Sequence, residues 1–264
     1  MTHPRIMGIL NATPDSFYDR GAFFSLEKAI ARGLEIAQEG ADILDIGGES
    51  ARPGALPVEE KEELARVIPL IDALAPQLSI PLSIDSHKPA VVAAALEKGA
   101  QLINDISGFA HPAMREIAAS SQADLCIMHM QKNPQTMQLD PHYPEGVIPH
   151  ILHFFEERIS LLLQAGVKES RLILDPGIGF GKTVTQNLEL IRSIDRFKSF
   201  GLRILIGASR KSFLQKIFNK PACDLLNASV IVHALSVIKG ADIVRVHDVQ
   251  AHREMCTLYQ QILV

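Results

Sequence analysis

Short apolar runs, each ending in or followed by a polar side chain, recur eight times along the 264 residues and constrain the fold more than any other feature. Runs this short and this rich in Ile, Val and Leu are typical of parallel strands that are buried on both faces of a sheet. The segments between them carry apolar residues at helical spacing, as in 26–37 and 148–162. The eight predicted strands span residues 5–11, 42–47, 81–85, 101–106, 124–129, 171–175, 203–208 and 242–247.

Three similar phrases mark the places where a helix gives way to a strand. They are E-G-A-D at 39–42, K-G-A-Q at 98–101 and K-G-A-D at 239–242, and each follows an amphipathic stretch and precedes an apolar one. Glycine just past a helix end can adopt the left-handed conformation that satisfies the last carbonyls. We therefore predict short helix-to-strand joints at these positions.

The polar residues at the strand ends distinguish a closed barrel from an open sheet. An open doubly wound sheet binds its ligand at one switch point, so polar residues would gather after only a few strands. In this chain nearly every strand ends in one, and a chain of about 250 residues is typical of a (β/α)₈ barrel. We predict a single-domain TIM barrel over residues 1–264, with its site at the carboxyl ends of the strands. The polar residues are Asn11, Asp45 with Glu49, Asp85, Asn104, His129, Asp175, Ser209 and His247.

Composition and charge exclude several classes of protein. A formal net charge of -4 gives no basic field for a nucleic-acid backbone. The three cysteines are far apart and lack C-x-x-C spacing, which argues against disulfides and thiolate metal sites. The chain shows no signal-peptide pattern and no run of the roughly 18 apolar residues that span a membrane. We expect a cytoplasmic protein that acts on small molecules, without nucleic-acid or membrane partners.

Asp85, Asn104 and Asp175 each lie at the end of an apolar strand. One such residue could simply cap the following helix, but three together indicate a ligand. Carboxylates at a barrel mouth need complementary donors, and a planar heterocycle with a guanidine-like edge supplies paired N–H groups. An aminopyrimidinone is therefore a plausible ligand.

The glycine-rich segment from Asp175 to Thr183, D-P-G-I-G-F-G-K-T, matches neither common nucleotide motif. A phosphate-binding loop would need glycine where Pro176 stands, and the spacing does not fit G-x-G-x-x-G. We interpret the glycines as allowing backbone to pass close to a bound ring, with Phe180 placed to stack on it. A tight turn without ligand contact is the alternative.

Cations gather after the last two predicted strands. Residues 209–212, S-R-K-S, are predicted to open a helix, and barrels often bind phosphate after strands 7 and 8. Arg245 and His247 alternate along strand 8, so they point to the same side and, beside Lys211, would bind an anion. A histidine buried in the core is the alternative for His247.

The first two long loops add Asn11 and Arg52 to the predicted mouth. An Asn oxygen together with phosphate oxygens suits Mg²⁺, which commonly keeps few protein ligands. Arg52 could meet a substrate anion, although a solvated loop cation is the alternative. We expect structural roles for the remaining histidines considered, which are His87, His129, His150, His153 and His252.

Ordered motifs over nearly the whole chain resemble those of the dihydropteroate synthase family. They are M-G-I-L-N-A-T-P-D-S-F, D-I-G-G-E-S-A-R-P-G, S-I-D-S-H-K-P, I-N-D-I, M-H-M-Q, L-D-P-G-I-G-F-G-K, S-R-K-S and R-V-H-D. The resemblance implies condensation of 6-hydroxymethyl-7,8-dihydropterin diphosphate with 4-aminobenzoate, giving 7,8-dihydropteroate and pyrophosphate. It also implies a homodimer and a target of sulfonamides.

The resemblance assigns roles to individual positions. It implies a dissociative reaction in which Mg²⁺, Arg245 and His247 neutralise the departing pyrophosphate and Asp85 faces the developing cation, with Lys211 also in the catalytic set. The pterin would contact Asp85, Asn104, Met128, Asp175 and Lys211. The aminobenzoate site would comprise Arg52, Pro53, Phe180, Lys211 and Ser212. The pyrophosphate would lie against Asn11, Arg245 and His247, with Asn11 as the protein ligand of Mg²⁺.

The chain departs from the family pattern at a few positions, and two rival functions share parts of the site. Ala51 replaces the usual threonine of S-T-R-P-G, residues 86–87 replace a threonine-containing pair, and Tyr18 and Arg20 alter the first loop. A methyltetrahydrofolate methyltransferase-type barrel would use the same acids but needs no pyrophosphate site. A noncatalytic pterin-binding homologue is the other alternative, and only measured turnover excludes it.

Overall fold

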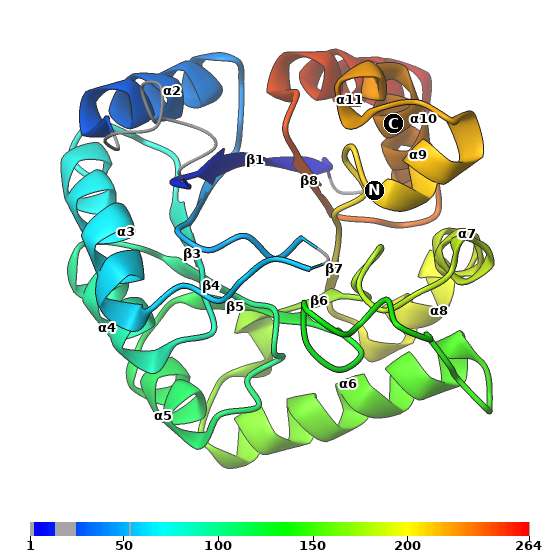
Figure 1. Ribbon diagram of the computed structural model, residues 1–264, viewed down its shortest axis with the longest axis horizontal. Helices are drawn as coiled ribbons and strands as arrows, with labels where there is room; N and C mark the ends of the chain where they lie inside the picture. Colours follow the sequence, from blue (N-terminus) through cyan, green and yellow to red (C-terminus); the bar gives the residue numbers. More distant parts are fainter. Residues whose placement is uncertain (1–2, 14–24, 53, 264) are drawn as a thin grey trace.

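The computed structural model describes residues 3–13, 25–52 and 54–263. Its eight strands are all parallel and follow one another around a closed barrel in chain order, with β8 pairing back onto β1. Figure 1 shows the helices arranged around this barrel. The predicted TIM barrel is confirmed. The strands are β1 (Arg5–Asn11), β2 (Ile43–Gly47), β3 (Leu82–Asp85), β4 (Leu102–Asp105), β5 (Asp124–Met128), β6 (Leu172–Asp175), β7 (Arg203–Ile206) and β8 (Ile243–Val246).

Every predicted strand is present, and its ends differ from the prediction by at most two residues. Helices cover the outside of the barrel between successive strands, and α11 follows β8. Three 3₁₀ turns, 169–171, 198–200 and 222–224, complete the regular structure of the described residues. The helices are α2 (Leu26–Gln38), α3 (Glu60–Leu74), α4 (Pro89–Glu97), α5 (Pro112–Ser120), α6 (Val147–Gln164), α7 (Val184–Arg192), α8 (Ile194–Phe197), α9 (Ser212–Phe218), α10 (Leu226–Ile238) and α11 (Val249–Leu263).

One helix start differs from the prediction. The helix after β7 was expected to open at Ser209, but α9 begins at Ser212, with Lys211 as its extended N-cap. Arg210 has a φ of 56°, in the left-handed region. A left-handed residue cannot continue a right-handed helix, so residues 208–210 form a separate turn before α9.

The three predicted helix-to-strand joints are confirmed. Gly40, Gly99 and Gly240 follow the last turns of α2, α4 and α10 and have φ values of 98°, 104° and 105°. In each joint an alanine two positions before the strand begins donates its N–H back to a helix carbonyl. The joints therefore end the helix and turn the chain into the sheet within a few residues.

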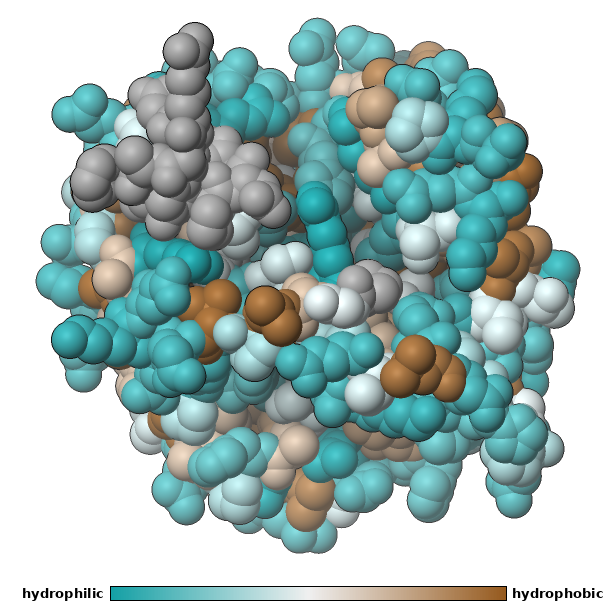
Figure 2. All heavy atoms as spheres, in the orientation of Figure 1, coloured by the Kyte–Doolittle hydropathy of each residue, from teal (hydrophilic) through white to brown (hydrophobic). Residues whose placement is uncertain are grey.

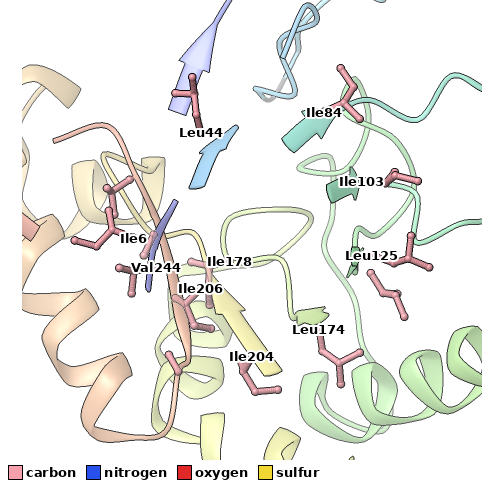
Figure 3. Packing of buried hydrophobic residues seen from close by; sticks show 14 of the residues in the cluster. Ile6, Leu44, Ile84, Ile103, Leu125, Leu174, Ile178, Ile204, Ile206 and Val244 are labelled. Carbon is pink, nitrogen blue, oxygen red and sulfur yellow. The ribbon is translucent and has the colours of Figure 1, made fainter. Parts of the chain in front are cut away.

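Alternation along the strands separates two apolar layers. One buried cluster fills the inside of the barrel and consists of Met7, Ile43, Leu102, Cys126, Ile173, Leu205 and Ile243. The neighbouring positions, such as Leu44, Ile103 and Leu174, point outward and pack in the larger cluster with the helices (Figure 3). Because side chains alternate with a period of two, residues two positions beyond an inward-facing one also face inward. Among the described residues, none of the helices has the length and apolarity that crossing a membrane requires.

Candidate active site

The inward-facing positions at the carboxyl ends of the strands are polar. Asp45 and Asn104 lie two residues beyond Ile43 and Leu102 of the inner cluster, and Asp175 and Arg245 lie two beyond Ile173 and Ile243. Asp85 is level with Asn104 in the next strand of the barrel. The barrel therefore brings together at one mouth the residues that the sequence places at its strand ends. Figure 2 shows hydrophilic side chains around a central hollow on the face that carries the loop after β5.

Arg245 joins two acids at the centre of this mouth. Its Nε lies 2.5 Å from Asp45 Oδ2 and its Nη2 lies 2.5 Å from Asp85 Oδ2. Asn104 donates its side-chain N–H to the same Asp45 oxygen at 3.1 Å. Asp45 is fully buried, and sequence reasoning gave it no specific role. Its position two residues beyond Ile43, on the inner face of β2, is the signal that could have identified it.

Burial and charge shift the pKa values of this group. Burial raises the pKa of Asp85 to about 7, although the positive charge of Arg245 opposes the shift. Burial disfavours the charged form of Arg245, but the carboxylates of Asp45 and Asp85 outweigh it and raise the guanidinium pKa. Arg245 therefore stays charged and Asp85 titrates near neutrality.

A second acid-cation pair lies across the mouth. Asp175 is 4% exposed and accepts the N–H of Gly177 at 2.7 Å, and burial raises its pKa. The Lys211 ammonium lies 4.4 Å from the centre of the Phe180 ring and donates to the carbonyl of Ile178. Burial lowers the pKa of Lys211 to about 8, while the charge of Asp175 opposes that shift. Lys211 thus lies beside Asp175 and Phe180.

Gly207 lies beside both cations. A Cβ built on Gly207 would lie 3.7 Å from both Arg245 Cβ and Lys211 Nζ. Lys211 and Arg245 therefore border the same space, as the sequence predicts.

The side chain of Lys182 lies inside the glycine-rich loop and binds its backbone carbonyls. From the sequence, no role was predicted for Lys182. Its buried ammonium donates to the carbonyls of Gly177 at 2.8 Å and Phe180 at 2.9 Å, and it lies 3.1 Å from His129 Nδ1. Gly177 has a φ of 69°, and a Cβ there would come within 1.8 Å of the His129 carbonyl. The loop can therefore fold around Lys182 only with glycine at 177. The close approach here is to the backbone of His129, and contact of this loop with a bound ring stays a prediction.

The loops after β7 and β8 meet through a serine and a histidine. The Ser209 hydroxyl oxygen accepts the backbone N–H of His247 at 3.3 Å and lies 3.0 Å from His247 Nδ1. Burial, together with Arg245 and Arg210, lowers the pKa of His247 to about 4. His247 is therefore neutral at pH 7. In the tautomer whose Nδ1 accepts the Ser209 hydroxyl, the ring carries its proton on Nε2, which can then donate to an anion.

The loop after β2, residues 48–58, is held at both ends. Arg66 on α3 donates to the carbonyl of Gly48 at 2.7 Å. Lys88 donates to the carbonyl of Val58 at 2.7 Å and pairs with the carboxylates of Glu49 and Glu63. These buried contacts fix the loop that carries Arg52.

Arg52 itself is exposed, and its charge contributes to lowering the pKa of His247. The predicted neighbour Pro53 lies outside the described residues, as do Tyr18 and Arg20 of the first loop. Gly54 donates its N–H to the carbonyl of Pro134 in the loop after β5 at 3.0 Å. The loops after β2 and β5 are thus joined above the barrel.

Positions where the chain departs from the expected family pattern line one cavity beside this loop. Ala51, Ser86 and His87 lie on its wall together with Asp85. These three residues, at which the chain departs from the family pattern, therefore lie next to Asp85. Glu49, Glu63 and Ile106 complete the lining.

The remaining predicted residues lie on the strands and loops of the same mouth. Met128 is buried at the end of β5, level with Asp175 in the neighbouring strand. Ser212 is the first residue of α9 and is half-buried. Phe180 and Arg52 come from two different loops and Ser212 from the start of α9, and the contacts of the described residues include none that joins them directly.

Asn11 is the predicted Mg²⁺ ligand. It is half-buried at the end of β1, level with Gly47 of β2. Within the described ranges, the protein offers no cluster of three or more His, Cys, Asp and Glu side chains that could hold a metal by itself. One amide oxygen at an open mouth fits an ion that takes most of its ligands from phosphate and water, as Mg²⁺ commonly does.

Comparisons with known proteins give a consistent assignment. Residues 7–247 match the family described as pterin binding enzyme. The dihydropteroate synthase of Haemophilus influenzae is 44% identical over 257 residues, which is 97% of this chain and 93% of that protein.

Solved structures agree with that match. The Yersinia pestis dihydropteroate synthase, crystallised with a sulfonamide drug complex, has a TM-score of 0.93 and 40% identity and covers 98% of this chain and 94% of its own. The Xanthomonas albilineans enzyme with 4-aminobenzoic acid has a TM-score of 0.92 and 41% identity, covering 98% and 93%.

Proposed function

The chain belongs to the pterin-binding enzymes and among them to the dihydropteroate synthases, and from this premise we propose how its barrel mouth carries out the reaction. The enzyme is a transferase that joins 6-hydroxymethyl-7,8-dihydropterin diphosphate to 4-aminobenzoate and releases pyrophosphate. One observation carries the assignment of residues. Arg245 lies between the central acids and the loops after β7 and β8, so a heterocycle site and an anion site share one side chain.

The acids form the pterin side of the proposed site. Asp175 and Asn104 face inward from β6 and β4 and are almost completely buried, so a ligand with paired N–H donors would satisfy them. Met128 supplies an apolar wall and Lys211 a cation beside Asp175. A half-buried Phe180 presents its ring next to the Lys211 ammonium.

The donors form the pyrophosphate side. Arg245 brings a permanent charge, and neutral His247 brings an N–H that Ser209 orients. Asn11 would hold Mg²⁺, which supplies positive charge to the diphosphate when bound. Among described residues, the hydrogen bonds of Arg245 engage Nε and Nη2, which leaves Nη1 for a phosphate oxygen.

We propose that the bond between the pterin methylene carbon and the diphosphate oxygen breaks first, and that the electron pair leaves with the diphosphate. Asp85 then stabilises the cation left on the methylene, and the amine nitrogen of 4-aminobenzoate attacks that carbon and loses a proton. Preorganised charges near the reacting atoms are the main source of rate enhancement in such a step. Arg52, Pro53, Phe180, Lys211 and Ser212 are the residues we assign to the aminobenzoate.

The surface of α10 and α11 supports a further proposal, that the enzyme is a homodimer. Ile231, Leu235 and Ile238 form an exposed apolar stripe on α10, and Leu258 and Ile262 extend exposed apolar surface on α11. Contiguous apolar surface of this kind is typical of subunit interfaces. We also propose a cytoplasmic location, with which the three free cysteines are consistent.

The activity is tested by incubating the purified protein with dihydropterin diphosphate and Mg²⁺, with and without 4-aminobenzoate. Pyrophosphate release and dihydropteroate formation are followed together, and the expected result is equal amounts of both, only when amine and Mg²⁺ are present. Chelation of the metal should stop the reaction, and its replacement should restore it. Pterin binding without turnover would favour a noncatalytic homologue. Methyl transfer to a corrinoid would favour the methyltransferase alternative.

A further inference from the structure

Two buried histidines lie behind the loops after β7 and β8. His233 on α10 and His252 on α11 are both fully buried, and His233 Nδ1 lies 2.9 Å from His252 Nε2. The backbone N–H of Ala208 reaches His233 Nε2 at 3.0 Å. His252 Nδ1 lies 2.7 Å from the carbonyl of Asp248. A chain of three hydrogen bonds therefore connects the β7 loop to the β8 loop through two imidazole rings.

The backbone N–H of Ala208 indicates how the protons of this chain are arranged. The N–H of Ala208 can only donate, so His233 Nε2 is an acceptor and the proton of the neutral ring is on Nδ1. Nδ1 then donates to His252 Nε2, and His252 donates from Nδ1 to the Asp248 carbonyl. Burial lowers the pKa of both rings, and the neighbouring charge of Lys211 acts in the same direction on His233.

The turn at residues 208–210 depends on further contacts with α10 and α11. Ser229 on α10 accepts the backbone N–H of Arg210 at 2.9 Å. The Arg210 guanidinium forms two hydrogen bonds to the Asp248 carboxylate, which directly precedes α11. Arg210 has a left-handed φ of 56°, which an arginine adopts only when its surroundings hold it there.

The same turn sets the groups that face an anion. It carries Ser209, whose hydroxyl lies 3.0 Å from His247 Nδ1, and it leads directly into Lys211. Two apolar side chains would fill the space of the imidazoles without a polar network, and burying polar groups costs free energy unless every one is paired. All four ring nitrogens of the two histidines have a hydrogen-bond partner. The partners at the two ends of the chain are backbone groups, the N–H of Ala208 in the loop after β7 and the carbonyl of Asp248 in the loop after β8.

We infer that His233 and His252 are positioning residues for the diphosphate half of the substrate, holding the turn at 208–210 so that Ser209 orients His247. The inference rests on the proposed function for the identity of the anion. Neither ring touches the substrate. Loss of the histidine pair therefore weakens binding of the diphosphate and leaves the pterin acids on β3, β4 and β6 in place.

The test compares His233→Phe and His252→Phe, which keep most of the volume of each ring, with the wild type. Calorimetry with pyrophosphate and Mg²⁺ should show about a tenfold higher Kd in both variants, since each leaves a buried polar group unpaired. The Kd for 6-hydroxymethylpterin, which lacks the diphosphate, should change less than about twofold. The acids assigned to the pterin lie on strands away from the turn at 208–210, and distant sites behave nearly independently. His233→Gln, whose side-chain oxygen can still accept from Ala208, should recover part of the loss.

Ser236→Ala is the matched control, because Ser236 is also buried on α10 and its hydroxyl donates to the carbonyl of Val232 in the same helix. If the wild type itself does not bind pyrophosphate, the proposed anion site fails, and the inference that rests on it is overturned with it. If the wild type binds it and the folded variants bind equally well, the inference is wrong. Ring ¹⁵N spectra of the wild type give a second check that needs no variant, and a proton on His233 Nε2 would contradict the hydrogen-bond chain.

Discussion

At the scale of single residues, Arg245 links the two halves of the site. Its guanidinium lies between Asp45 and Asp85, at 2.5 Å from each, in a mouth from which much of the solvent is excluded. A buried ion pair adds little net stability when intact, but removing one partner leaves the other charge uncompensated. Arg245, the cation we propose for the anion, is therefore also the counterion of two acids inside the barrel.

Arg245→Met is expected to destabilise the protein by about 3–5 kcal/mol at pH 8, because the buried carboxylate of Asp45 and the half-buried one of Asp85, which is 15% exposed, lose their counterion. The cost should shrink as the pH falls through about 7, where the raised pKa of Asp85 lets that carboxyl take up a proton. Urea unfolding at pH 8 and pH 5.5 measures both effects.

Arg203→Met is the control for this change, because Arg203 pairs with Asp124 while both are about one-third exposed. Its cost should be within about 1 kcal/mol at both pH values. Equal costs for the two variants at pH 8 would show that the Arg245 pairs are not buried charges.

The pH dependence of the reaction should follow two residues of the site. Asp85 is ionised above its pKa of about 7, and Lys211 is charged below its pKa of about 8. We expect kcat/KM for the pterin diphosphate to be bell-shaped, with its maximum between these values and limbs that fall about tenfold per pH unit. Steady-state rates from pH 5.5 to 9.5 test this.

Asp85→Asn should lower the rate and flatten the acid limb, since the titrating carboxyl is gone. Asp72→Asn, at an exposed position on α3, should leave the whole profile unchanged. An acid limb that persists unchanged in Asp85→Asn would assign it to another group, for example Asp175, whose pKa is also raised.

At the scale of elements, the loop after β2 is not free at its base although its tip is exposed. Lys88, at the start of α4, contacts Glu49 at the beginning of the loop, Val58 at its end and Glu63 on α3. Glu63 is 1% exposed, so the contacts are shielded from water. Lys88 thus joins both ends of the loop after β2 to each other and to helix α3.

Lys88→Met should release this loop while leaving the barrel intact. We expect KM for 4-aminobenzoate to rise about tenfold with kcat changed much less, because Arg52 loses its fixed position but the central acids do not move. Steady-state kinetics with the amine varied at saturating pterin diphosphate measure this split.

Lys98→Met provides the comparison, because Lys98 follows the same helix α4 and forms an exposed pair with Asp72. It should leave both kinetic constants unchanged. A fall in kcat with no change in KM for Lys88→Met would place Lys88 in the chemical step instead.

At the scale of the whole molecule, exposed apolar residues are concentrated on one side of the barrel. Five of those on α10 and α11 are between 52% and 74% exposed, whereas Leu163 on α6 is 40% exposed. The helix α10 therefore packs its polar residues Ser229, His233 and Ser236 inward and presents isoleucine and leucine outward. A helix with polar residues on its inner face and apolar residues on its solvent-facing side is favourable only if another protein surface covers that apolar side.

Leu235→Glu is expected to shift the proposed dimer to monomer, because a carboxylate at the centre of an apolar interface loses its hydration without a partner. Sedimentation velocity over a range of protein concentrations measures the association. Leu163→Glu on α6 should not alter it. A wild type that remains monomeric at every concentration would rule out the proposed dimer.

The sequence by itself determined the barrel. Hydrophobic runs such as 42–47 are too short for helices and too apolar for surface strands, so local physics decides their type, and the glycine joints fix where each helix ends. The position of Asp85, Asn104 and Asp175 at the ends of predicted strands also placed them at the barrel mouth before any contact was known.

Tertiary structure decided which of these residues touch. No pattern in the sequence shows that Arg245 pairs with Asp45, 200 positions away, or that Lys182 folds back beneath its own loop. It did not show the His233–His252 pair either, because each histidine alone lies on an ordinary helix. Such contacts depend on the closure of the barrel, which sets the distances between side chains on strands and helices far apart in the chain, and periodicity carries no information about those distances.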